Sequence, residues 1–187
     1  MRVLFIDTHR DEMTVILKTE NGEKRISRVS DRSHSEVVMP AIKEIIESEN
    51  LRIDGLDSIV VVNGPGSFTG VRIGVVIAKT IAYTRNIPVK SITSLEVCGE
   101  SSDRKGDIVA VRDPKGVYSA RIENGKYTDM QYRKNEAFDK YVAMNHLSVI
   151  EEGDIDLDKI LNYLDNTENV DPHFLNPIYI KEIDALK

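Results

Sequence analysis

The chain is poor in three features that would each indicate a particular class of protein. It has one cysteine, Cys98, among 187 residues, so an internal disulfide is excluded and a reducing cytoplasm is expected. Its net charge is −6, which leaves no basic excess to hold nucleic acid unaided. No apolar run approaches the roughly 18 residues of a bilayer-spanning helix. The run at residues 2–7 is also too short for a signal peptide.

The stretch "VVNGPGSFTGVRIG", residues 61–74, lacks the spacing of either standard phosphate loop. Its glycines read G-x-G-x-x-x-G, one residue longer than the dinucleotide fingerprint, and no lysine follows Gly70 as in a P-loop. The simpler interpretation is a sharp turn from a strand into a helix, with Ser67 or Thr69 as the N-cap. An anion contact at the helix start stays open, with these candidate residues: Gly66, Ser67, Thr69, Gly70 and Arg72.

The first half of the chain predicts the element order β-β-β-α-β-α-β-α. Two strands turn at Asn21–Gly22, a strong hairpin signal, and helices follow at about 34–49 and 70–85. Capping boxes are predicted at Ser33 with Glu36 and at Thr93 with Glu96. Three antiparallel strands followed by βα crossovers predict a mixed five-stranded sheet in an α/β fold.

A polar break at residues 99–107 separates this lobe, residues 1–99, from a second one at 107–187. The second lobe reads β-β-β-α-β-α, an abbreviated repeat of the first. In this repeat Asp113 corresponds to Asp7, because each ends the first strand of its copy.

A duplicated β-β-β-α-β-α unit resembles the actin-like (ribonuclease H-like) fold of sugar kinases, heat-shock chaperones and actin. One branch of that superfamily is similar in detail. "LFIDT", "HSEVVMPAIKEII", "NGPGSFTGVRIG" and "IPVKSITSLE" resemble the bacterial TsaB family, also called YeaZ, in order over residues 1–97. The second half resembles it through "AVRDPKGVYSARIENG" and "NPIYIK" and is shorter than is usual in the family.

The resemblance implies a non-catalytic partner of the related TsaD enzyme. With the ATPase TsaE, these proteins attach a threonylcarbamoyl group to the adenosine beside the anticodon of certain tRNAs. The chain would then reach tRNA only through the complex, and it would need no metal and no cofactor of its own. The resemblance also implies that the helices at 34–49 and 70–85 pair with their counterparts in TsaD.

Apolar residues on these two helices exceed what one small sheet needs, so we expect them to form the partner surface. The same surface would make a two-fold homodimer of the isolated chain. The predicted interface residues are Val37, Val38, Ala41, Ile42, Ile45, Val71, Gly74, Val75, Ala78 and Ala82.

An alternative function is a small actin-like phosphotransferase or ATPase that uses Asp7, Asp113 and the loop at 64–70. The sequence weighs against it, because no glycine follows Asp7 and Pro114, which has no N–H, follows Asp113. A peptidase, a third possibility, would need a nucleophile or a metal pair. No two of the four histidines lie four residues apart, and Cys98 is in an apolar setting, so we expect no catalytic residues.

Overall fold

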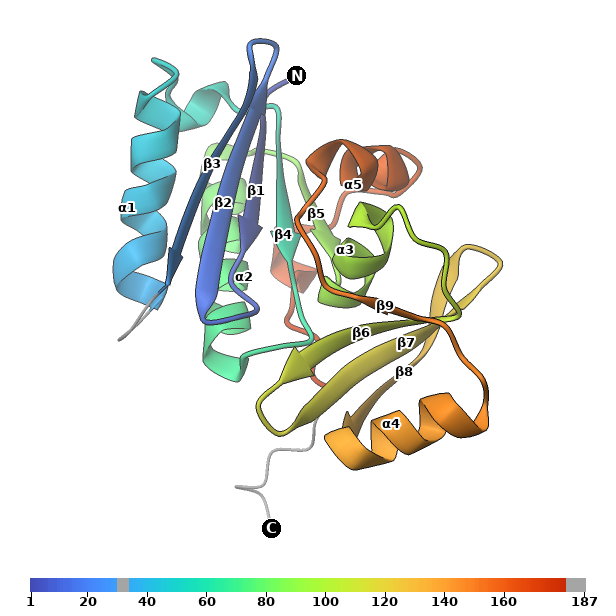
Figure 1. The fold of residues 1–187 in the computed structure, drawn as a ribbon. Coiled ribbons are helices and arrows are strands. Elements are labelled where there is room, and N and C mark those ends of the chain that lie inside the picture. The colour runs from blue at the N-terminus through green and yellow to red at the C-terminus, as the bar shows by residue number, and fades with distance from the viewer. Residues whose placement is uncertain (30–33, 181–187) are drawn as a thin grey trace. The chain divides into compact units, whose positions relative to one another are not determined.

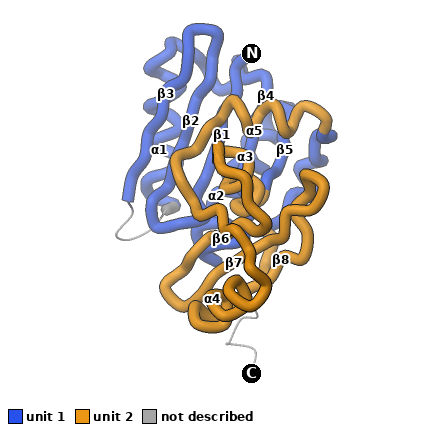
Figure 2. The backbone as a smooth tube through the Cα atoms, turned by 45° about the vertical axis from the view of Figure 1, so that its right-hand side comes forward, with its two compact units in different colours: residues 1–92, 167–177 blue, residues 93–166, 178–187 orange. Residues whose placement is uncertain are grey.

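The computed structural model describes residues 1–29 and 34–180, which divide into two compact units (Figure 2). Unit 1 contains Met1–Ile92 together with Thr167–Pro177, a segment from near the end of the chain that we call the return segment. Unit 2 contains Thr93–Asn166 and the described residues from 178 onward. The sequence predicts one boundary, at residues 99–107. In the structure the first part of unit 1 ends earlier, at Ile92, and residues 167–177 belong to unit 1 and not to unit 2.

Unit 1 is built on a mixed five-stranded sheet in the order β3-β2-β1-β4-β5 (Figure 1). β2 pairs antiparallel with β1 and β3, whereas β4 pairs parallel with β1 and β5. The sheet and its element order confirm the fold class predicted from the sequence. The bounds are β1 Val3–Asp7, β2 Glu12–Thr19, β3 Gly22–Val29, α1 His34–Glu47, η1 Ile53–Gly55, β4 Ser58–Val62, α2 Phe68–Arg85, β5 Val89–Ile92 and η2 Pro172–Phe174.

Helices α1 and α2 share one hydrophobic core with alternate residues of the strands. Leu4 and Ile6 of β1 lie in this core, as do Ile59 and Val61 of β4, because side chains two apart in a strand point to the same face. α1 begins at His34, so the capping box predicted at Ser33 lies outside the described residues.

The segment that returns to unit 1 contributes to the same core. The amide of Val170 donates to the carbonyl oxygen of Val89 at 2.8 Å, and Leu175 is buried among the residues of the α1–α2 core. This segment therefore completes unit 1 although more than 70 residues of unit 2 come between them in the sequence.

Unit 2 has a four-stranded sheet in the order β8-β7-β6-β9, with β9 parallel to β6. After an initial helix, α3, its elements follow the predicted order β-β-β-α-β-α, and the β7–β8 hairpin turns at Asn124 and Gly125, both with positive φ. The bounds are α3 Ser94–Ser101, β6 Ile108–Asp113, β7 Gly116–Glu123, β8 Lys126–Lys134, α4 Asn135–Met144, β9 Val149–Glu151 and α5 Leu157–Leu164.

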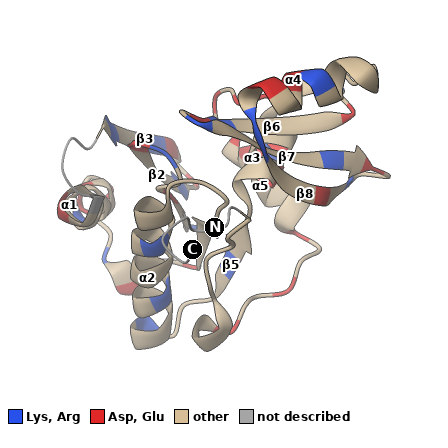
Figure 3. Ribbon diagram, turned by 90° about the horizontal axis from the view of Figure 1, so that it is seen from below, with Lys and Arg blue, Asp and Glu red and all other residues tan. Residues whose placement is uncertain are grey.

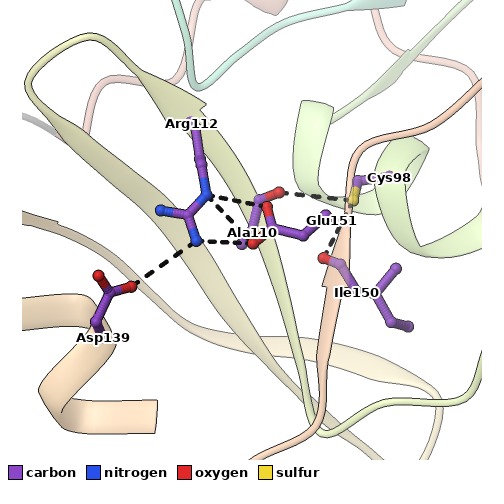
Figure 4. A network of polar contacts seen from close by, with 6 residues as sticks. All are labelled: Cys98, Ala110, Arg112, Asp139, Ile150 and Glu151. Atoms are coloured by element: carbon purple, nitrogen blue, oxygen red, sulfur yellow. Dashed lines mark hydrogen bonds and ion pairs between the residues drawn. The ribbon is translucent and has the colours of Figure 1, made fainter. Parts of the chain in front are cut away.

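Helix α3 belongs to unit 2, not to the first lobe as predicted. The predicted capping box is present at its start, since Thr93 and Glu96 each accept the other's backbone N–H. Its buried Cys98 lies with Sγ 3.8 Å from the Ala110 carbonyl oxygen and 3.6 Å from that of Ile150 (Figure 4). The core of unit 2 thus holds α3, which explains the shift of the boundary.

Candidate functional site

Three consecutive polar residues at the end of β1 are buried: Asp7, Thr8 and His9. The carboxylate of Asp7 accepts the backbone N–H of His9 at 3.0 Å, and the same oxygen lies 2.6 Å from Nδ1 of the His9 ring. Burial by itself would raise the pKa of the Asp7 carboxyl, but the charge and the hydrogen bonds of His9 outweigh it and hold that pKa below its ordinary value. Asp7 is therefore an ionised residue that closes its own turn.

The residues after Asp7 contact the start of α2 directly. The hydroxyl of Thr8 donates to the carbonyl oxygen of Gly70 at 2.8 Å, and the amide of Ser67 donates to the carbonyl oxygen of His9 at 2.8 Å. These two hydrogen bonds join segments about 60 residues apart, and they fix α2 against the end of β1.

Two glycines make this contact possible. A Cβ on Gly66 would overlap the carbonyl oxygen of His9, and a Cβ on Gly74 would overlap the hydroxyl of Thr8. At both positions the space beside the glycine is occupied by residues of the chain itself. Gly66 thus has the structural role that the loop spacing favoured, and Gly74, beyond the loop in α2, has a similar one.

The start of α2 is capped internally. Of the two predicted candidates, Ser67 and not Thr69 is the N-cap, and its hydroxyl accepts the amide of Gly70 at 3.2 Å. Arg72 lies over the ring of Phe68, 4.9 Å from its centroid. The anion contact stays a prediction, but the amides of Ser67 and Gly70 that it would use already donate to protein oxygens.

Asn63, at the end of β4, is a polar residue that the sequence reasoning missed. Its amide donates to the carbonyl oxygen of Ile92 at 3.0 Å, and its side chain is buried with no donor to Oδ1 among the described residues. The sequence signal that could have identified Asn63 is its position directly after a buried strand.

The aspartate that corresponds to Asp7 in unit 2 is also held by its own turn. One oxygen of Asp113 accepts the amides of Lys115 at 2.7 Å and Gly116 at 2.8 Å, and the hydroxyl of Tyr132 at 2.9 Å. Asp113 therefore closes the β6–β7 hairpin, and Pro114 fits this turn because no donor is required from it.

The side chains predicted to form the partner surface lie mostly inside the chain. Eight of the ten are buried in the α1–α2 core, Gly74 is buried in α2, and Val37 is partly buried against the core. The buried ones are Val38, Ala41, Ile42, Ile45, Val71, Gly74, Val75, Ala78 and Ala82. Their apolar character is explained by the sheet beneath them, so a partner surface on these helices needs other residues.

The opposite face of α2 exposes large apolar side chains. Phe68 is 41% exposed, Val76 59% and Tyr83 62%. On α1, Met39 is 43% exposed. Sequence reasoning missed these residues because α2 is apolar almost all round, so its pattern does not tell the inner face from the outer one.

The return segment extends this exposed face at the C-terminal half of α2. The His173 ring packs edge-on against Tyr83, with 4.8 Å between centroids, and its carbonyl oxygen accepts Lys79 Nζ at 2.8 Å. A shallow cavity lies here between α2 and Pro172 of the segment. Phe174, the next residue, is also exposed.

Two further features bear on the class of the protein. Among the residues that the structure describes, no three His, Cys, Asp or Glu side chains are grouped so that they could hold a metal ion. None of the described helices combines the length and the apolar character that crossing a bilayer requires.

A known protein family matches most of the chain. The family described as "TsaD: tRNA N6-adenosine threonylcarbamoyltransferase" matches residues 26–169. The Bacillus subtilis tRNA threonylcarbamoyladenosine biosynthesis protein TsaB is 29% identical over 143 residues, 76% of this chain and 60% of the relative. The Haemophilus influenzae TsaB is 30% identical over 131 residues, 67% and 56% of the two chains. The chain thus spans less than two thirds of these relatives' length.

A solved structure from Pseudomonas aeruginosa, described as a protein similar to the peptidase YeaZ, has the same fold. It superposes with a TM-score of 0.75 at 18% identity, and it covers 96% of this chain and 99% of its own. At this identity the likeness shows the fold alone.

Proposed function

The chain belongs to the family of the tRNA N6-adenosine threonylcarbamoyltransferase TsaD, in its TsaB (YeaZ) branch, and we propose that it is a non-catalytic scaffold subunit of the complex that makes threonylcarbamoyladenosine in tRNA. The relatives' names support the pathway. In this proposal the catalytic subunit is of the TsaD type, and a TsaE-type ATPase acts through the complex in the cytoplasm.

The observation that carries the non-catalytic role is the filled junction between β1 and α2. Asp7 is bound by His9, and Thr8 and His9 occupy the space beside Gly74 and Gly66. A phosphotransferase needs its acidic groups and loop amides free to approach phosphate, whereas these already contact one another.

The partner surface in this proposal is the outer face of α2 with the adjoining part of α1. Exposed Val76 and Tyr83 supply the apolar centre that a standard protein interface of roughly 800 Å² per partner requires. The same face would form the two-fold homodimer of the isolated chain, in competition with the TsaD-type subunit.

Reconstitution tests the proposal. The purified chain, a TsaD-type subunit and a TsaE-type ATPase are combined with tRNA and the threonylcarbamoyl donor, and modified adenosine is measured. We expect modification only when the chain is present, and no ATP turnover by the chain alone. Turnover by the pure chain at about 1 per second, a kinase-like rate, would favour the phosphotransferase instead.

A further inference from the structure

The outer face of α2 carries positive charge without any negative charge. Over its whole length, Phe68–Arg85, the helix has Arg72, Lys79 and Arg85 and no aspartate or glutamate. Figure 3 shows this as blue bands without red along α2. Arg85 is paired, since its guanidinium lies 3.2 Å from the carboxylate of Asp54.

The other two cations are not neutralised in this way. Arg72 lies over the ring of Phe68, and Lys79 donates to the backbone carbonyl of His173. Neither makes an ion pair with a carboxylate within residues 1–29 and 34–180. Both contacts leave the positive charge in place at the surface of the helix.

These cations lie beside the exposed apolar residues. Arg72, Val76, Lys79 and Tyr83 are separated by four, three and four positions, a spacing that places them along one face of a helix. Val76 is thus flanked by one cation on each side along the helix. A helix that docks over Val76 must meet both of them.

The spacing also determines what happens when α2 meets a second copy of itself. In a two-fold antiparallel pairing, positions on opposite sides of the centre face each other. Arg72 and Lys79 lie symmetrically about the Val75–Val76 peptide, so a pairing centred on this peptide, beside exposed Val76, places Arg72 of each copy against Lys79 of the other. Two like-charge contacts then act against the homodimer.

We propose that Arg72 and Lys79 make this face selective for a partner helix whose apolar seam is flanked by carboxylates, and weaken its pairing with a second copy. This inference rests on the proposed function for the identity of the partner, a TsaD-type subunit. Charges at the edge of an interface favour one partner and repel another, because like charges brought together are destabilising.

The two associations should therefore respond to salt in opposite directions. Raising NaCl from 0.1 M to 1 M shortens the screening length from about 10 Å to about 3 Å. Screening removes the repulsion between two copies of α2 and strengthens self-association. The same screening removes the attraction to an acidic partner helix and weakens the complex.

The deciding variant is Arg72→Glu in the full chain. It converts both like-charge contacts of the homodimer into opposite-charge contacts, so self-association should tighten by about tenfold at 0.1 M NaCl, measured by sedimentation equilibrium. Binding to the purified TsaD-type subunit, measured by titration calorimetry, should weaken by a similar factor. Arg72→Glu/Lys79→Glu restores like charges and should dissociate the homodimer again.

Lys105→Glu is the matched control. Lys105 is an exposed residue of unit 2, and its replacement changes the net charge by the same amount as Arg72→Glu. It should change neither affinity by more than about twofold. Circular dichroism checks that each variant keeps its fold.

The outcomes separate this inference from the proposed function. If Arg72→Glu shifts both associations in the same direction, or leaves self-association unchanged, the charge selectivity is contradicted even though the TsaD-type subunit still binds. If the TsaD-type subunit binds neither variant nor the natural chain while Arg72→Glu self-associates as expected, the proposed function fails instead.

Discussion

At the scale of single residues, the contact between Asp7 and His9 stabilises a buried carboxylate in its charged form. The carboxylate is ionised because the histidine beside it lowers its pKa more than burial raises it. A folded-state pKa below the unfolded value of about 3.9 contributes stability that is present above that pH. This contribution is lost as the pH falls toward the folded pKa.

Asp7→Asn should therefore destabilise the chain in a pH-dependent way. At pH 7 we expect a loss of about 3 kcal/mol in the free energy of unfolding, because His9 is left without its charged partner. The loss should be smaller near pH 3, because below the unfolded-state pKa the natural carboxylate itself contributes less to the free energy of unfolding. Urea unfolding at both pH values measures it, with exposed Asp11→Asn as the control. A deficit that is the same at both pH values would contradict the lowered pKa.

Gly74 and Thr8 form a contact whose origin can be tested by removing it from both sides. Gly74→Ala should cost about 2 kcal/mol, because its methyl group overlaps the Thr8 hydroxyl. In a Thr8→Ala background the same substitution should cost much less, since the overlapping atom is gone.

Gly66→Ala is the comparison. Its methyl group would overlap the backbone carbonyl oxygen of His9, and replacing a side chain cannot relieve that overlap. Urea unfolding of the four combinations of Gly74 and Thr8 residues measures the coupling. Equal costs of Gly74→Ala in the two backgrounds would show that the glycine is needed for another reason.

At the scale of elements, helix α2 has two faces that the sequence does not distinguish. Val75 and Val76 are neighbours of identical chemistry, yet Val75 is 2% exposed and Val76 59%. The order of strands and helices followed from periodicity, turn residues and caps. Which side of a largely apolar helix meets the sheet depends on contacts such as Thr8 with Gly70, made across about 60 residues, so the apolar pattern alone could not predict it.

The two valines give a matched pair of substitutions. Val75→Glu should unfold unit 1, because an unpaired carboxylate in the core costs several kcal/mol. Val76→Glu should change stability by less than about 0.5 kcal/mol and yet prevent binding of the TsaD-type subunit. Thermal melting followed by circular dichroism gives the first result, and co-elution in gel filtration the second. A folded Val76→Glu variant that co-elutes like the natural chain would place the partner surface elsewhere.

On the scale of the whole molecule, the division into units depends on contacts between distant parts of the chain. The polar break at residues 99–107 predicted that there are two units, but not that α3 belongs to the second one or that residues 167–177 return to the first. Neither feature has a local signal, because each depends on which core receives a few apolar side chains. Cys98 of α3 is buried in the core of unit 2, and Leu175 of the return segment is buried in the core of unit 1.

Leu175→Ala should accordingly destabilise unit 1 from the far end of the chain. We expect a loss of about 3 kcal/mol, because the buried leucine leaves a cavity in the α1–α2 core. Phe174→Ala, the exposed neighbour, should change stability by less than about 0.5 kcal/mol. Chemical denaturation of both variants makes the comparison, and equal effects would show that the return segment is not part of the core.

The return of residues 167–177 has a consequence for synthesis on the ribosome. When residues 1–92 have left the ribosome, the strands and α-helices of unit 1 are all present, but its core still lacks Leu175 and β5 lacks the hydrogen bond from Val170. Unit 1 must remain incomplete in the nascent chain while Thr93–Asn166 of unit 2 are translated. The unit translated first therefore cannot complete its core until residues 93–166 and the return segment have been translated.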